Sequence, residues 1–179
     1  MIFTGKLVKV PGFTSEFKNA VVIHLTDAEV AQAIAEAMRL REESLQLNFQ
    51  ERMIASNKSP DQIQKEGALG EAAVRKAFKI KWYQPETPQW SGAPNKNPDV
   101  GNFEVRITPY DNGGLIVRPR DRINKPFILV VSKGSHDHMI IGWIHISNAK
   151  SNEFWRTDIP GPAAWFVPQT ALNSIESLS

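Results

Sequence analysis

Four prolines interrupt the segment from Lys79 to Pro98, at positions Pro85, Pro88, Pro94 and Pro98. Proline lacks a backbone donor and fixes φ, so this segment is predicted to be a long loop and neither a helix nor a central strand. Regular structure must therefore lie on either side of it. Mainly helical patterns precede the segment and mainly strand patterns follow it, which predicts an α/β fold of the mixed α+β kind.

Before the loop, the pattern predicts strands within residues 1–25 and two helices within residues 27–78. Thr26 and Glu29 have the spacing of a capping box, in which hydroxyl and carboxylate satisfy free backbone donors, and the helix that follows is expected to end near Asn48. Ser59 with Pro60 marks the start of the second helix, because proline is tolerated at the first helical position. This helix is expected to end near Phe78.

After the loop, residues 99–168 alternate apolar and polar positions between turn signals, which predicts a β-rich region. A short helix is expected over residues 169–178. With 179 residues, of which 41% are hydrophobic, the chain is long enough to bury one substantial core. A single domain over residues 1–179 is therefore predicted.

Composition narrows the classes of function. The chain has no cysteine, which excludes disulfides and thiolate metal sites. No secretory h-region and no run of about 18 apolar residues is visible, so a soluble, cytoplasmic protein without membrane contact is expected. A net charge of +2 permits contact with nucleic acid without arguing for it.

The segment "NPDVGNFEVRITPYDNGG" crowds charges onto a predicted strand. Side chains alternate along a strand, so Glu104 and Arg106 are expected on one face, and Phe103, Val105 and Ile107 on the other. A turn at Gly101 is expected to bring the Asp99 carboxylate beside that of Glu104. Two adjacent carboxylates repel, and a divalent cation such as magnesium or manganese relieves the repulsion. The alternative is a solvated face with a cross-strand ion pair.

The second predicted helix contributes another carboxylate. In "KEGALGEAAVRKAF", Glu71 lies at helical spacing from Gly67, Val74 and Phe78, beside the predicted buried stripe. Each glycine inside a helix costs about 1 kcal/mol relative to alanine, so Gly67 and Gly70 indicate a close approach to another backbone. Glu71 is therefore expected to reach the same site as the charged strand.

These segments, in the order "GALGE", "PDVGNFEVR", "FILVV" and "MIIGWIHIS", resemble the PD-(D/E)XK nuclease superfamily, in particular its small bacterial and phage members. The likeness covers about residues 62–172 and lies in the ordering of short motifs. It implies a restriction-endonuclease-like core, in which a helix that carries a glutamate packs on a mixed sheet. It also implies magnesium-dependent hydrolysis of phosphodiester bonds.

The resemblance implies roles for particular residues. Asp99 and Glu104 take the place of the principal magnesium or manganese ligands, the Val105 carbonyl that of a further ligand, and Glu71 that of the helix carboxylate. Arg106 stands where the superfamily has lysine. Arginine keeps the positive charge but is effectively never deprotonated, so it can stabilise charge in the transition state and cannot act as a base.

A basic loop follows one predicted strand in "RPRDRINK", and only Asp121 opposes its four cations. It is expected either to contact phosphates of DNA or to be an ordinary solvated loop. Its basic residues are Arg118, Arg120, Arg122 and Lys125.

The leading hypothesis is a metal-dependent deoxyribonuclease, and two alternatives stay open. One is a catalytically inactive nucleic-acid-binding protein of the same fold, which the arginine at position 106 favours. The other is a structural or protein-interaction role in which the carboxylates form solvated ion pairs. Because many nucleases of the superfamily act as dimers, the resemblance also allows a homodimer.

Overall fold

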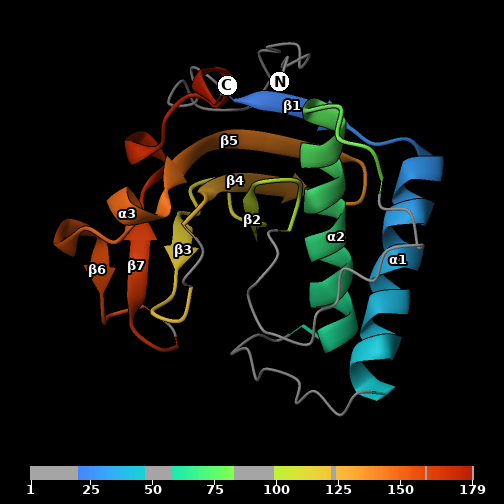
Figure 1. Ribbon diagram of the computed structural model, residues 1–179, viewed down its shortest axis with the longest axis horizontal. Coiled ribbons are helices and arrows are strands. Elements are labelled where there is room, and N and C mark those ends of the chain that lie inside the picture. Colours follow the sequence, from blue (N-terminus) through green and yellow to red (C-terminus); the bar gives the residue numbers. More distant parts are fainter. Residues whose placement is uncertain (1–19, 47–57, 83–98, 122–123, 160, 179) are drawn as a thin grey trace.

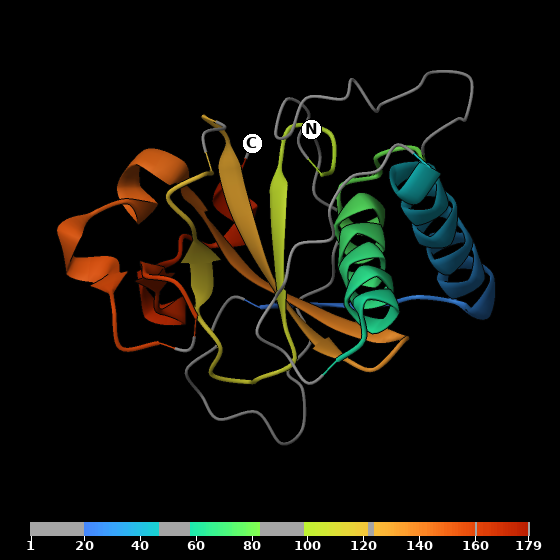
Figure 2. The ribbon, with the colours of Figure 1, turned by 90° about the horizontal axis from the view of Figure 1, so that it is seen from below.

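The computed structural model describes residues 20–46, 58–82, 99–121, 124–159 and 161–178. A four-stranded sheet lies at the centre, with helices α1 and α2 on one side and a small three-stranded sheet on the other (Figure 1). The same layers are seen from the edge strand β2 in Figure 2. Helices combined with mixed sheets confirm the general α/β class.

The two long helices begin where their caps predict. In α1 (Asp27–Gln46) the capping box is formed, because the Thr26 backbone N–H donates to Glu29 Oε2 at 2.8 Å and the Glu29 N–H donates to Thr26 Oγ1 at 3.3 Å. In α2 (Pro60–Ala77) Ser59 forms a second capping box, with Gln62. Both predicted helices are confirmed over the described residues.

The central sheet has the strand order β1-β5-β4-β2 and is mixed. Strand β2 pairs in parallel with β4, whereas β5 is antiparallel to both β4 and β1. The small sheet has the order β3-β7-β6 and is antiparallel. The strands are β1 (Val21–His24), β2 (Glu104–Thr108), β3 (Leu115–Val117), β4 (Pro126–Lys133), β5 (Asp137–His145), β6 (Trp155–Arg156) and β7 (Ala164–Val167).

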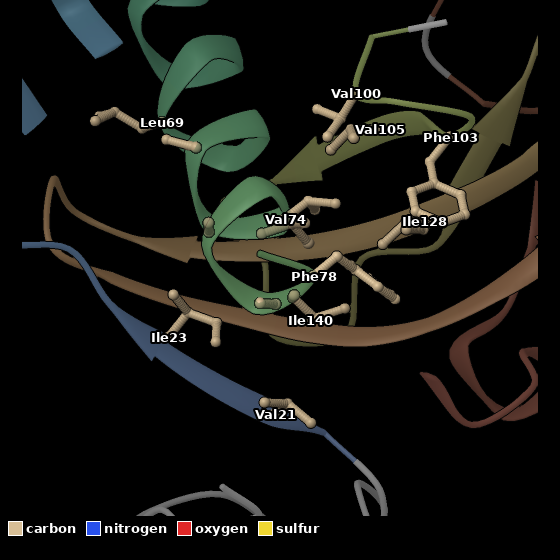
Figure 3. Close-up of a cluster of buried hydrophobic side chains, with 14 of the residues drawn as sticks. Val21, Ile23, Leu69, Val74, Phe78, Val100, Phe103, Val105, Ile128 and Ile140 are labelled. Carbon is tan, nitrogen blue, oxygen red and sulfur yellow. The ribbon is translucent and has the colours of Figure 1, made fainter. Parts of the chain in front are cut away.

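Two hydrophobic cores cover the two faces of the central sheet, and β4 contributes to both because its side chains alternate. On the helix side, Ile128 and Val130 pack with α2 residues such as Val74 (Figure 3). On the other side, Phe127 and Leu129 pack against residues of the small sheet. Strand β2 is the edge strand of the central sheet, beside β4 (Figure 2). Its Val105 belongs to the helix-side core, and its Arg106 lies over the Phe127 ring on the other side.

Some expectations fail near the C-terminal end. No single helix forms over residues 169–178; two 3-10 turns, Gln169–Ala171 and Ile175–Ser177, replace it. The reason is that Asn173, between them, exchanges both backbone hydrogen bonds with Trp143 of β5. Strand β6 was not predicted, because its two residues are too short to show a period.

Other predictions concern residues outside the ranges that the structure describes. The proline-rich loop lies outside them from residue 83 to residue 98, as does the chain before residue 20. Within the described residues, no helix combines the length and the apolar character that crossing a membrane requires.

Candidate active site at the edge strand

A tight turn ahead of β2 brings Asp99 back to the strand. Val100 and Phe103 exchange backbone hydrogen bonds of 3.0 and 2.8 Å, and Gly101 between them has φ +55, a conformation that glycine adopts without strain. The Asp99 side chain is thereby folded onto the strand, where its Oδ2 accepts the Val105 N–H at 2.9 Å. The predicted approach of Asp99 to Glu104 depends on this turn.

Glu104 and Arg106 share one face of β2, as the alternation predicts. Arg106 Nη1 lies 3.3 Å from Glu104 Oε2 and 3.6 Å from Asp99 Oδ2. Only 9% of the Glu104 side chain is exposed, so this carboxyl is not part of a solvated face. The opposite face carries the apolar side chains, with Val105 in the helix-side core.

Helix α2 presents Glu71 to the same place. Gly70 faces Ile107 of β2 so closely that a Cβ there would lie 2.3 Å from Ile107 Cγ1. Gly70 thus has a close neighbour, but this is the Ile107 side chain, so the predicted approach to another backbone is wrong. Gly67 has nothing within 4 Å of the equivalent position, so the same interpretation is wrong for that residue. The contact of Gly70 with β2 sets the distance at which its neighbour Glu71 meets the strand.

Burial is the main cause that raises the pKa of all three carboxyl groups. Burial, followed by the Asp99 charge, raises the pKa of Glu71 to about 8, and the same two causes raise the pKa of Glu104 to about 7. Burial also raises the pKa of Asp99, against the opposing effects of the Val105 N–H and Arg106. Glu71 and Glu104 thus retain protons nearer to neutral pH than ordinary carboxyls do, mainly because they are buried.

Two residues that the sequence analysis did not assign take part in the site. Arg75, one turn after Glu71 on α2, donates from Nη2 to the Asp99 carbonyl at 3.1 Å and lowers the pKa of Glu71. Asp121 Oδ2 lies 3.1 Å from Arg106 Nη2, although the two are 15 positions apart. The spacing of Arg75 from Glu71 was a usable signal, whereas no local pattern connects Asp121 with Arg106.

The donor set suits a hard divalent cation held by few protein ligands. Among the residues that the structure describes, no group of three or more His, Cys, Asp or Glu side chains is arranged to hold a metal ion. Magnesium is usually bound through one or two carboxylates with water and phosphate in the other positions, which the pair Asp99 and Glu104 matches. The Val105 carbonyl accepts from Arg106 Nη1 at 3.2 Å and so faces the same group.

Residues of the basic loop make hydrogen bonds within the fold that the sequence does not predict. The Arg118 backbone N–H donates to Asp121 Oδ2 at 2.8 Å, and its side chain is half-buried. Lys125 Nζ donates to Asn102 Oδ1 in the turn before β2. Arg120 is exposed, and Arg122 lies outside the described residues. Lys125 is therefore next to the site. The contact of this loop with phosphate groups of DNA stays a prediction.

Comparisons of the chain with protein-family models, with curated proteins and with solved structures found no match. In the structure, Asp99, Glu104, Arg106 and Glu71 gather at one end of the edge strand.

Proposed function

We propose that this chain is a divalent-metal-dependent deoxyribonuclease with a restriction-endonuclease-like core, similar to small members of the PD-(D/E)XK superfamily. The observation that carries the proposal is the gathering of Asp99, Glu104 and Glu71 from a turn, a strand and a helix, with pKa values of Glu71 and Glu104 raised to about 8 and about 7. Such crowding is a cost to stability that a cation or a proton must offset.

Asp99 and Glu104 would hold magnesium or manganese, with the Val105 carbonyl as a further oxygen donor and Glu71 as a nearby carboxyl. The bound ion would lower the pKa of water and offset the charge of the phosphate. Arg106, always protonated, stabilises negative charge that develops on the phosphate. Burial raises the pKa of Glu71 to about 8, which is close enough to neutrality for a group that transfers a proton. Lys125 and Arg120 would contact the DNA backbone.

Cleavage assays with a matched variant test the proposal. Plasmid and labelled single-stranded DNA are incubated with magnesium, with manganese and with chelator. We expect cutting that requires the metal and falls at least about a hundredfold in Glu104→Gln, because the variant removes a ligand charge. Glu42→Gln makes the same change at an exposed position of α1 and should cut as the native chain does. Equal cutting by both variants, or cutting in chelator, would contradict the proposal.

A second candidate is a nucleic-acid-binding protein without catalytic activity. The observation that favours it is the ion pairing of Arg106 with both Glu104 and Asp99, since a guanidinium already occupies the place next to these carboxylates that a cation would take. This candidate predicts DNA affinity that falls with salt, with no cleavage and no dependence on metal.

A further inference from the structure

Arg106 is bound on more than one side. While Nη1 contacts Glu104 and the Val105 carbonyl, Nη2 lies 3.1 Å from Asp121 Oδ2. The guanidinium carbon also lies 4.8 Å from the centre of the Phe127 ring, on the neighbouring strand β4. A planar guanidinium with five donors can bind two carboxylates at once, so Asp121 and Glu104 hold different nitrogens of the same group.

Asp121 is itself firmly placed. Its Oδ2 accepts the Arg118 N–H at 2.8 Å, and its backbone N–H donates to the Arg118 carbonyl at 2.9 Å, which closes a turn after β3. Its own carbonyl accepts from Lys150 Nζ at 2.6 Å, and this ammonium lies 5.2 Å from the centre of the Trp165 ring in the small sheet. Only 12% of the Asp121 side chain is exposed. Asp121 thus connects Arg106 to the second sheet.

A cation at Asp99 and Glu104 would compete with Arg106 Nη1 for the same oxygens. If Arg106 were not held by Nη2, both of its amino nitrogens would be available to the carboxylate pair, and a bidentate contact is the stronger arrangement. The bond to Asp121 keeps Nη2 away from that pair. Nη1 alone then has to leave when the carboxylates bind a cation, and it becomes available to a phosphate oxygen.

We infer that Asp121 is a positioning residue, which holds the Arg106 guanidinium through Nη2 so that only Nη1 exchanges between the carboxylate pair and a phosphate. This inference rests on the proposed function. It assigns to Asp121 a role in metal affinity that is exerted through Arg106. If Asp121 acted merely through its charge, its removal would change the metal affinity equally with and without Arg106.

A double-mutant cycle on manganese affinity separates the two cases. Mn²⁺ binding is titrated by calorimetry for the native chain, Asp121→Ala, Arg106→Ala and the double variant. We expect Asp121→Ala to weaken binding about tenfold in the native background and less than about twofold in the Arg106→Ala background. Asp121→Asn keeps one acceptor oxygen and should have a smaller effect than Asp121→Ala. Asp158→Ala removes an exposed aspartate paired with Arg156 and should change nothing.

Equal weakening by Asp121→Ala in both backgrounds would overturn the inference, as would no weakening in either. Both results leave the proposed function standing, provided that the native chain binds Mn²⁺. A native chain that does not bind Mn²⁺ would overturn the proposed function, and the inference with it. The melting temperature of each variant shows that it is folded at the temperature of the titration.

A second measurement needs no metal. Restricted rotation of the Arg106 guanidinium gives separate proton and nitrogen resonances for its amino groups, and the Arg106→Ala spectrum identifies them. We expect these resonances in the native chain and in Asp158→Ala, and their averaging in Asp121→Ala. Averaged resonances in the native chain would show that the guanidinium is not held and would overturn the inference, whatever the affinity for Mn²⁺.

Discussion

At the scale of single residues, protons and cations are alternatives for the same carboxyls. The pKa values of Glu104 and Glu71 are raised from an ordinary value of 4.5 to about 7 and about 8. The folded chain therefore holds protons that the unfolded chain has already released. Because the folded state binds more protons over this range, the free energy of unfolding falls as the pH rises toward 8.

We expect the melting temperature of the metal-free chain to fall between pH 6.5 and pH 8.5, by roughly 5 °C if the two shifts amount to about 1–2 kcal/mol after solvent screening. Glu71→Gln and Glu104→Gln should each flatten the fall, because glutamine does not titrate, and Glu42→Gln should not. Burial lowers the pKa of His138 from 6.5, so this residue makes the free energy of unfolding rise with pH, mainly below pH 6.5. The prediction is wrong if both site variants keep the native slope.

At the scale of elements, the position of α2 on β2 depends on the absence of a single side chain. Gly70 and Gly67 lie one turn apart on α2, but only Gly70 faces Ile107. A Cβ at Gly70 would lie 2.3 Å from Ile107 Cγ1, an atom close to the backbone. This clash can therefore be removed only if the helix or the strand moves. That movement would also displace Glu71 from the site.

Gly70→Ala is expected to destabilise the chain by up to about 2 kcal/mol, since overpacking costs about 1–3 kcal/mol and the gain in helix propensity offsets only about 1 kcal/mol of it. Gly67→Ala has the same gain without the clash and should stabilise the chain by up to about 1 kcal/mol. Urea unfolding of both variants measures the difference. Effects of the same sign would contradict this account of the helix contact.

The elements that the sequence predicts well are those with local signals. Thr26 and Ser59 cap α1 and α2 through contacts within three residues, and Asp99 reaches the Val105 N–H of β2 through one short turn. The C-terminal helix fails because Asn173 pairs with Trp143, a contact with no local signature. Asp121 was treated as a lone charge in a basic loop for the same reason, since its partner Arg106 lies on another strand.

At the scale of the whole molecule, β4 makes the two cores interdependent. Its alternate side chains, such as Val130 and Leu129, belong to the helix-side core and to the core beneath the small sheet respectively. Removal of either core would expose one face of the same strand. The helices and the small sheet are therefore expected to unfold together.

Leu129→Ala tests this dependence. The substitution lies in the core beneath the small sheet, whereas the signal that is measured comes from the helices on the opposite face. Loss of a fully buried leucine should cost about 2–5 kcal/mol. We expect the helical circular dichroism signal to disappear at a lower urea concentration, with a single transition that coincides with tryptophan fluorescence. A helical transition that stayed at the native midpoint would show that the two sides unfold separately.

The pairing of β1 with β5 has a consequence for synthesis on the ribosome. Among the described strands, residues 21–24 pair with residues 137–140, and β2 pairs with residues 127–131 of β4. A nascent chain that has emerged as far as the two helices has no sheet on which to place them. The carboxylates of Asp99 and Glu104 thus gain their surroundings late in translation, and a chain truncated before β4 would carry these residues without those surroundings.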